Sequence, residues 1–287
     1  MMHHMTRANH PADRLCEAID SVGVPLCVGI DPVANMLPSE LQGLEPIDAY
    51  RTFCTGIIDV VCGDAAAVKF QSACFERLGS HGVTLLGSLR QHAADAGLQV
   101  ILDAKRGDIG ISATHYAAAA TADGPCDWIT VNPYLGIDGI EPFLEAGLGV
   151  FGLVRTSNPS GDAIQQQQLN DGRTVSESVA DLFHTLGEAH LGDCGWSSLG
   201  AVVGATKPDD AMILRQRMPR QIFLMPGVGA QGGRPEDVAS CFADGHGALI
   251  PASRSIIYPS SDGGDWQQAI ANAAASLANE LRVGGSV

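Results

Sequence analysis

The chain has 287 residues, a formal net charge of −15 and a hydrophobic content of 45%. This length can bury a large core without disulfide bonds, and single (β/α) barrels commonly reach it. The negative charge argues against nucleic-acid binding, which needs a positive surface to displace counterions. No apolar run is long enough to span a bilayer, so we expect no membrane association.

The cysteines indicate a reducing compartment. The chain has eight, without a CxxC pair or a metal-ligand spacing, and several lie in apolar segments, such as Cys27, Cys54 and Cys74. We interpret them as small buried hydrophobic residues. The first residues, MMHHMTRANH, lack the apolar core of a secretory signal. We therefore expect a cytoplasmic protein.

In chain order, a helix expected at about 11–22 is followed by eight short apolar, β-branched runs that alternate with helical stretches. Further helices are expected at 46–62, 82–97, near 174–190 and at 234–245. Apolar strands separated by helices indicate a parallel sheet covered on both faces. Eight such units predict one α/β domain over 1–287, a (β/α)8 TIM barrel with an N-terminal helix. The runs are 25–32, 66–72, 98–105, 128–133, 149–157, 199–206, 222–229 and 247–254.

Two kinds of segment are expected to lie outside this core. The tails at about 1–9 and 283–287 are expected to be flexible, and the QQQQ run at 165–168 is interpreted as an exposed turn.

Polar residues end all eight apolar runs. In a barrel of this kind the active site lies at the carboxyl ends of the strands, so these residues are the candidates for function. They are Asp31, Lys69 with Gln71, Asp103 with Lys105, Asn132, Thr156 with Ser157, Thr206, Gly229 and Arg254.

The stretch ILDAKRGDIG (101–110) places four charges within six positions, which fits a solvated loop, a metal site or a catalytic cluster. Asp103 and Lys105 are two apart and share a strand face. With Lys69 on the adjacent strand and Asp108 three residues on, they predict an alternating Lys–Asp–Lys–Asp cluster. Adjacent lysines repel a divalent cation, so we expect no metal and interpret the cluster as catalytic.

A phosphate site is indicated after the last two strands, the usual position in these barrels. Glycine-rich loops let backbone N–H groups approach an anion, and an arginine can bind it bidentately. A dinucleotide site is disfavoured because the glycine pattern lies at the seventh strand, without a fresh βαβ unit. The candidate residues are Gly229, Gln231, Gly232, Gly233, Ser253 and Arg254.

Other strand ends suit the rest of a nucleotide. Asp31, in GIDP, could cap the following helix or bind a ribose hydroxyl, which we favour beside a phosphate site. Thr156, Ser157 and Asn158 supply neutral donors and acceptors for a polar heterocycle. Lys207 is interpreted as an exposed surface lysine.

These motifs together resemble the orotidine 5′-phosphate decarboxylase family, in its bacterial branch with the KRGDIG form. Asp103-x-Lys105-x-x-Asp108 resembles its signature, although DxKxxD alone also occurs in related phosphate-binding barrel enzymes. The flanking blocks agree over nearly the whole chain: GIDP (29–32), VKFQSACFE (68–76), VNPYLG (131–136), RTSNPSG (155–161), VVGAT (202–206), PGVGAQGG (226–233) and SR (253–254).

The resemblance implies loss of carbon dioxide from orotidine 5′-monophosphate to give UMP, the last step of pyrimidine nucleotide synthesis, without a cofactor. Lys105 would stabilise and protonate the carbanion at C6, Asp103 would crowd the departing carboxylate, and Lys69 would bridge Asp103 and the ribose. A homodimer is implied, with active sites at the subunit interface. Asp108 and the hydroxyl of Ser112 or Thr114 would reach into the neighbouring site.

Two alternatives stay open at this point. One is a magnesium-dependent sugar-phosphate decarboxylase of the same fold group, against which Lys69 argues. The other is a barrel that binds a nucleotide without turnover, against which the complete set of charged residues argues.

Overall fold

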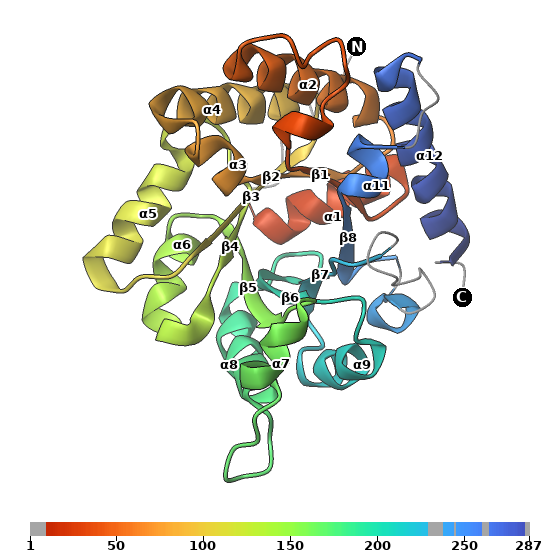
Figure 1. Ribbon diagram of the computed structural model, residues 1–287. Coiled ribbons are helices and arrows are strands. Elements are labelled where there is room, and N and C mark those ends of the chain that lie inside the picture. The colour runs from red at the N-terminus through yellow and green to blue at the C-terminus, as the bar shows by residue number, and fades with distance from the viewer. Residues whose placement is uncertain (1–9, 229–237, 244, 260–263, 285–287) are drawn as a thin grey trace, which may run out of the picture.

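The computed structural model describes residues 10–228, 238–243, 245–259 and 264–284. Within them, eight parallel strands pair in sequence order and close into a barrel, which confirms the predicted fold class (Figure 1). Each strand overlaps one of the predicted runs. The strands are β1 (Leu26–Ile30), β2 (Ala67–Gln71), β3 (Gln99–Arg106), β4 (Trp128–Val131), β5 (Gly149–Arg155), β6 (Ser197–Val203), β7 (Gln221–Leu224) and β8 (Ala248–Ala252).

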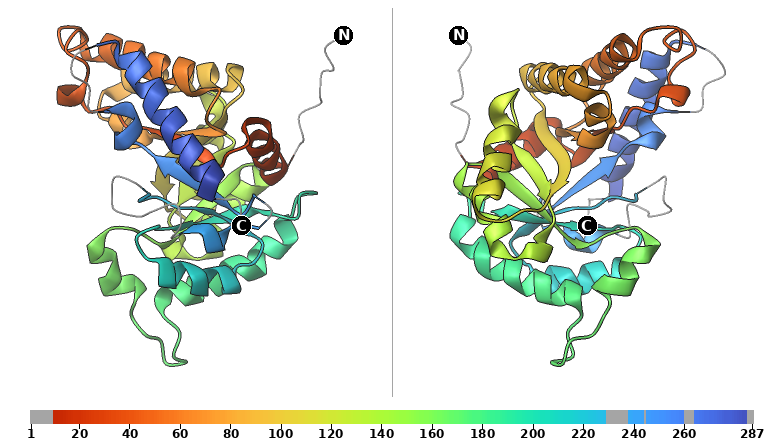
Figure 2. Two further views of the ribbon diagram at one scale, coloured as in Figure 1. Left: turned by 90° about the vertical axis from the view of Figure 1, so that its right-hand side faces the viewer. Right: turned by 60° about the vertical axis from the view of Figure 1, so that its left-hand side comes forward.

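Helices surround the barrel and occupy most of the predicted positions (Figures 1 and 2). The described helices are α1 (Pro11–Val22), α2 (Pro46–Val61), α3 (Ser72–Glu76), α4 (Gly79–Asp95), α5 (Gly110–Ala122), α6 (Glu141–Glu145), α7 (Asp162–Gln165), α8 (Val175–Gly187), α9 (Pro208–Arg217), α11 (Arg254–Ile257) and α12 (Trp266–Gly284).

The predicted segment boundaries need two corrections. The helix expected at 234–245 extends too far, because a 3-10 turn at Ala239–Cys241 is followed by a bridge between Ala243 and His246. The tail expected from 283 begins too early, because α12 continues to Gly284. Residues 1–9, 234–237 and 285–287 lie outside the described residues.

The N-terminal helix α1 closes the end of the barrel at which the strands begin. Pro11 starts the helix, in the first turn, where a backbone N–H would have no partner within the helix, and Gly23 ends it with φ +69°. The buried face of α1 carries Ala12, Leu15 and Ile19, which belong to the same core cluster as the strand residues inside the barrel. Figure 1 shows the helix behind the barrel strands.

Large side chains fill the barrel interior beside this helix. Trp128 stacks on Phe151, with ring centroids 4.4 Å apart. A Cβ at Gly149 would lie 2.3 Å from the Trp128 ring, so only glycine fits at this point of β5. Because this packing fills the end near α1, the polar strand ends are left to line the opposite mouth.

Candidate active site

Three charged side chains meet at this mouth, on the neighbouring strands β2 and β3. Lys69 Nζ donates to Asp103 Oδ2 at 2.7 Å, and Lys105 Nζ donates to Asp103 Oδ1 at 2.5 Å. The side chains of Asp103 and Lys69 are 8% and 12% exposed, whereas that of Lys105 is 46% exposed. The carboxylate and one lysine are therefore fixed in the protein, and the second lysine is accessible to a bound molecule.

Electrostatics keeps the two buried members of this triad charged. Burial by itself would raise the pKa of Asp103, but the attraction of Lys69 and Lys105 and their hydrogen bonds hold it well below its usual range. Burial would likewise lower the pKa of Lys69, and the nearby Asp103 outweighs this and raises it. Asp103 and Lys69 therefore both stay ionised at neutral pH.

Thr130 on β4 is a fourth member of the cluster that the sequence reasoning missed. Its hydroxyl donates to Asp103 Oδ1 at 2.8 Å and accepts the backbone N–H of Lys105 at 2.9 Å. The side chain is buried. One signal was present in the sequence, because Thr130 lies two residues before Asn132 and so shares its strand face.

The backbone of β3 is irregular at Lys105. Leu102 pairs with Ile129 and Arg106 with Val131, so β3 has two extra residues against β4 in this interval. Lys105 has φ +46°, a left-handed conformation that is uncommon outside glycine. The regular alternation expected for Asp103 and Lys105 is therefore replaced by a bulge, which turns the Lys105 N–H towards Thr130.

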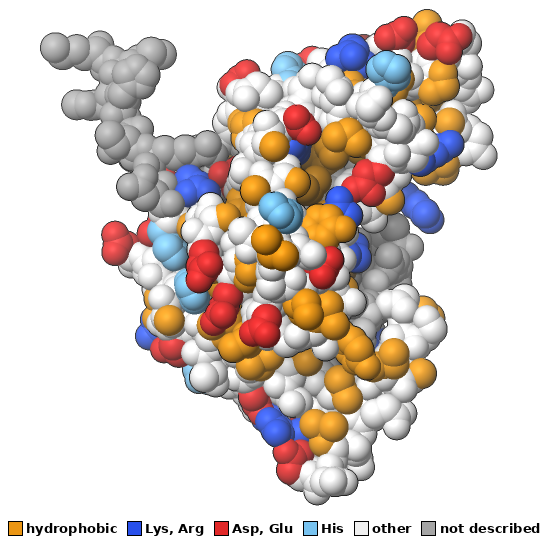
Figure 3. Space-filling view, turned by 90° about the vertical axis from the view of Figure 1, so that its left-hand side faces the viewer, with side chains coloured by type: hydrophobic (Ala, Val, Ile, Leu, Met, Phe, Trp, Pro, Cys, Tyr) orange, Lys and Arg blue, Asp and Glu red, His pale blue; other side chains and the backbone are white. Residues whose placement is uncertain are grey.

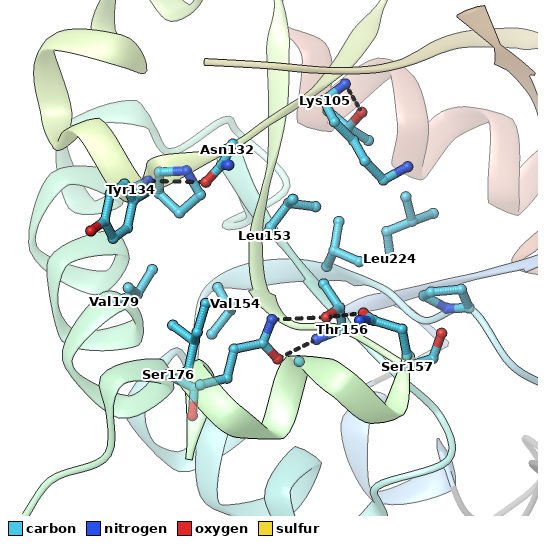
Figure 4. A pocket seen from close by; sticks show the side chains of 18 of the residues that line it. Lys105, Asn132, Tyr134, Leu153, Val154, Thr156, Ser157, Ser176, Val179 and Leu224 are labelled. Atoms are coloured by element: carbon cyan, nitrogen blue, oxygen red, sulfur yellow. Dashed lines mark hydrogen bonds between the residues drawn. The ribbon is translucent and has the colours of Figure 1, made fainter. Parts of the chain in front are cut away.

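A cavity of about 690 Å³ opens beside the triad (Figure 4). Lys69, Asp103 and Lys105 line one part of it, and Asn132 and Ser157 line other parts. Apolar side chains of Leu153, Val154, Val202 and Leu224 contribute to the wall. The cavity thus combines an apolar surface with charged and neutral hydrogen-bonding groups, as expected of a small-molecule site.

A smaller cavity of about 310 Å³ shares Lys69 with the first and is lined by Asp31, Ser253 and Arg254. Burial raises the pKa of Asp31, against the effects of Lys69, of a hydrogen bond with Ser253 and of Arg254. Asp31 Oδ1 is buried without a hydrogen-bond partner in the described structure. The next helical turn begins at Ala34 without a side-chain cap, so the capping alternative for Asp31 is not seen.

Several predicted site residues lie elsewhere. Gln71 ends β2 and lines neither of these two cavities. Asp108 accepts the N–H of Ile109 at 2.8 Å, and no ion pair joins it to a lysine in the described part of the chain. Ser112 and Thr114 lie on α5. A single chain therefore assembles three members of the expected four-charge cluster. The predicted residues Gly229, Gln231, Gly232 and Gly233 lie outside the described residues.

The segment after β5 is held by a network around the buried Arg155, which sequence reasoning also missed. Arg155, 2% exposed, pairs with Asp162 and with Asp210, each at 2.7 Å. Gln165 Oε1 accepts the N–H of Thr156 at 3.0 Å, and Gln165 Nε2 donates to Thr156 Oγ1 at 2.8 Å. These contacts fix the backbone just before Ser157.

This network corrects two expectations. The run at 165–168 is not simply an exposed turn, because Gln165 and Gln166 are half-buried, and Gln166 Nε2 donates to Asp210 Oδ2 at 2.8 Å. Lys207 is not a free surface lysine, since it is half-buried and pairs with Asp162 at 3.1 Å. After Gln165, the chain projects from the barrel before α8 begins (Figure 2).

Comparisons with known proteins agree on one family. A family model described as orotidine 5′-phosphate decarboxylase / HUMPS family matches residues 25–268. The orotidine 5′-phosphate decarboxylase of Rhodopirellula baltica is 41% identical, over 94% of this chain and 98% of its own. A Streptomyces avermitilis crystal structure, described as a candidate orotidine 5′-phosphate decarboxylase, aligns with a TM-score of 0.85 and 33% identity over 100% of both chains. The OMP decarboxylase of Leishmania donovani aligns with a TM-score of 0.77 and 30% identity over 96% of this chain and 99% of that one.

Proposed function

Because this chain belongs to the orotidine 5′-phosphate decarboxylase family, it converts orotidine 5′-monophosphate to UMP and carbon dioxide, and we propose that Lys69, Asp103 and Lys105 carry out the reaction. The observation that carries the proposal is the ion-paired triad at the barrel mouth, in which one carboxylate joins two lysines.

Lys105 is the group proposed to act on the reacting carbon. Loss of carbon dioxide leaves an electron pair at C6 of the pyrimidine, where the substrate offers no electron sink. An ammonium placed beside C6 is attracted more strongly as this charge develops, so it stabilises the transition state more than the substrate. Its proton then passes to C6, which gives UMP and a neutral lysine that regains a proton from solvent. The 46% exposure of the Lys105 side chain supports this role.

Asp103 is proposed to orient Lys105 and to oppose the substrate carboxylate. Two carboxylates at close range repel, and the repulsion ends when carbon dioxide departs. This requires an ionised Asp103, which the lowered pKa of the group supports. Lys69, bonded to the other oxygen of Asp103, is proposed to carry the link to the ribose.

The two adjoining cavities suit the two ends of a nucleoside monophosphate. We assign the pyrimidine to the larger cavity, with Ser157 at the base edge, and the phosphate to the smaller cavity at Ser253 and Arg254. Asp31 lines the smaller cavity beside Lys69, which lines both cavities, and is assigned to the ribose, which would offer hydroxyl donors to its unpartnered oxygen. Binding energy from the phosphate would then help to place the pyrimidine against Lys105.

We also propose a homodimer in which Asp108 and Ser112 or Thr114 approach the partner's site. An apolar patch on the α5 side of the molecule supports it (Figure 3). Ile111 is 75% exposed and Tyr134 is 83% exposed. Exposed apolar clusters of this kind are typical of protein interfaces. The patch consists of Ile109, Ile111, Tyr116, Tyr134, Leu135 and Ile137.

The remaining proposals concern cofactors and location. We propose that the reaction needs no metal or other cofactor, since Lys105 supplies the positive charge at C6. We also propose a single catalytic domain in the cytoplasm, which the eight free cysteines support. No described helix is both long and apolar enough to cross a membrane.

The test measures the fall in ultraviolet absorbance as orotidine 5′-monophosphate is consumed, with EDTA present. Lys105→Ala is compared with Arg51→Ala, which removes an exposed cation on α2. We expect turnover that EDTA leaves unchanged, that Lys105→Ala abolishes and that Arg51→Ala preserves. Turnover that requires added magnesium, or that survives in Lys105→Ala, would contradict the proposed mechanism. Tight UMP binding without turnover would favour the binding-only alternative.

A further inference from the structure

Two cysteines meet at the end of the barrel opposite the triad. Cys16 lies on α1, and Cys194 lies in the turn that precedes β6. The Asp13 carboxylate accepts the backbone N–H of Cys194 at 2.8 Å and that of Asp193 at 3.1 Å. Asp13 and Cys16 are three residues apart on α1 and so share one helix face. These contacts fix the turn against that face.

The Cys194 nitrogen lies 2.8 Å from Asp13 Oδ1, one helical turn from Cys16, and each thiol shifts the pKa of the other. The two thiols therefore lie on segments that are already in contact. None of the eight cysteines is in a disulfide. Both thiols are therefore reduced, on two segments that already pack together.

The environments of the two thiols give them different chemical roles. Cys194 is exposed, and the hydrogen bond from Cys16 and the backbone N–H of Trp196 lower its pKa, despite burial and the nearby Asp13. Cys16 is only 5% exposed, and its hydrogen bond to Cys194 and its burial raise its pKa. An accessible thiol of lowered pKa beside a second, protected thiol is the arrangement found in redox-sensitive cysteine pairs.

We propose that Cys16 and Cys194 are a thiol oxidation site at which hydrogen peroxide forms a reversible disulfide. The Cys194 thiolate attacks one peroxide oxygen, the O–O bond breaks, and the sulfur becomes a sulfenic acid as hydroxide leaves. Cys16 sulfur then displaces the sulfenic oxygen, which leaves as water after taking up the Cys16 proton. Both sulfur atoms are oxidised by one electron each, and the peroxide is reduced to water. A dithiol reductant reverses the reaction.

The disulfide would tie α1 to the barrel wall. Helix α1 is attached by the packing of Ala12, Leu15 and Ile19, and the new bond would add a covalent link between segments far apart in the chain. Cross-links that close long loops restrict the unfolded chain strongly. We expect the melting temperature of the oxidised protein to rise by about 5 °C. Turnover should be retained, because the pair lies at the opposite end of the barrel from the triad. This inference does not depend on the proposed catalytic roles.

The experiment treats the reduced full-length protein with hydrogen peroxide, blocks free thiols with an alkylating reagent and maps the peptides by mass spectrometry. We expect a peptide pair linked through Cys16 and Cys194 that dithiothreitol separates. Cys194→Ser should abolish both the link and the rise in melting temperature, and it is the decisive variant because Cys194 is exposed. The control Cys62→Ser alters another accessible cysteine, at the end of α2, and should leave both unchanged.

Three results would overturn the proposal. One is recovery of Cys194 as a sulfinic acid while Cys16 stays reduced. A second is a disulfide from Cys194 to another cysteine or to a second chain. The third is an oxidised protein that carries the link and melts at the same temperature as the reduced one.

Discussion

The hydroxyl of Thr130 offers a sharp test of how the triad is held. Thr130→Val keeps the shape of the side chain and removes the donor to Asp103 Oδ1, at 2.8 Å, together with the acceptor for the Lys105 N–H, at 2.9 Å. The residue is buried, so water is poorly placed to replace the hydroxyl. Both lost contacts hold the segment that positions Lys105.

The expected loss follows from the charge on Asp103. A hydrogen bond to a charged group contributes about 1.5–3 kcal/mol. Each 1.36 kcal/mol of barrier changes a rate about tenfold, so kcat should fall roughly ten- to a hundred-fold in Thr130→Val. The Michaelis constant should change less, because Ser157 and Arg254, which we assign to substrate binding, are untouched.

Steady-state turnover of orotidine 5′-monophosphate measures this effect, with circular dichroism as the check on folding. Thr130→Ser is the matched control, since it keeps the hydroxyl and loses a methyl group. It should retain most of the wild-type kcat. An unchanged kcat in a folded Thr130→Val protein, or an equal loss in both variants, would refute the reasoning.

Three further predictions concern charge and the segment after β5. Because burial raises the folded pKa of Asp31, its stabilising contribution is present below the unfolded pKa and is lost as pH rises through the folded value. Asp31→Asn should therefore raise the melting temperature at pH 7 but not at pH 3, and it should also raise KM. A melting temperature that does not rise at pH 7 would contradict this prediction. The lysines lower the folded pKa of Asp103, so its stabilising contribution is present above the unfolded pKa and is lost as pH falls towards the folded value. Asp103→Asn leaves Lys69 buried without its partner and should cost about 3 kcal/mol of unfolding free energy at pH 7. In denaturant titrations, this difference between variant and wild type should narrow below about pH 4. A difference that does not change with pH would contradict the lowered pKa of Asp103. Gln165→Leu should raise KM several-fold with a smaller change in kcat, whereas Gln167→Leu, at an exposed position, should change neither. Equal changes of KM in the two variants would show that the contacts of Gln165 to Thr156 do not contribute to substrate binding.

Much of the fold followed from the sequence because its signals are local. Each strand is a short apolar run bounded by turn residues, and each of β1, β4 and β8 is buried along its whole length, as a parallel sheet covered on both faces requires. Most of the candidate site could be predicted from the residues at the ends of these runs, because all strands of a parallel barrel end at the same mouth. The helix at 234–245 was placed less well because a short amphipathic pattern does not specify where a helix stops.

The barrel, the mouth at which we propose that the reaction occurs, and the charged residues Lys69, Asp103 and Lys105 that lie there could all be predicted from the sequence. How those charges are held depends on the tertiary structure, through the bulge with its left-handed Lys105 and the hydroxyl of Thr130 from the next strand. The contacts of Gln165 to Thr156, which fix the backbone before Ser157, also depend on it. The tertiary structure also brought the turn that carries Cys194 onto α1, the helix that carries Cys16. A strand pattern depends on neighbours two residues apart, so it can be read along the chain. Hydrogen bonds between residues far apart in sequence depend on strand register and loop path, which only the packed barrel fixes.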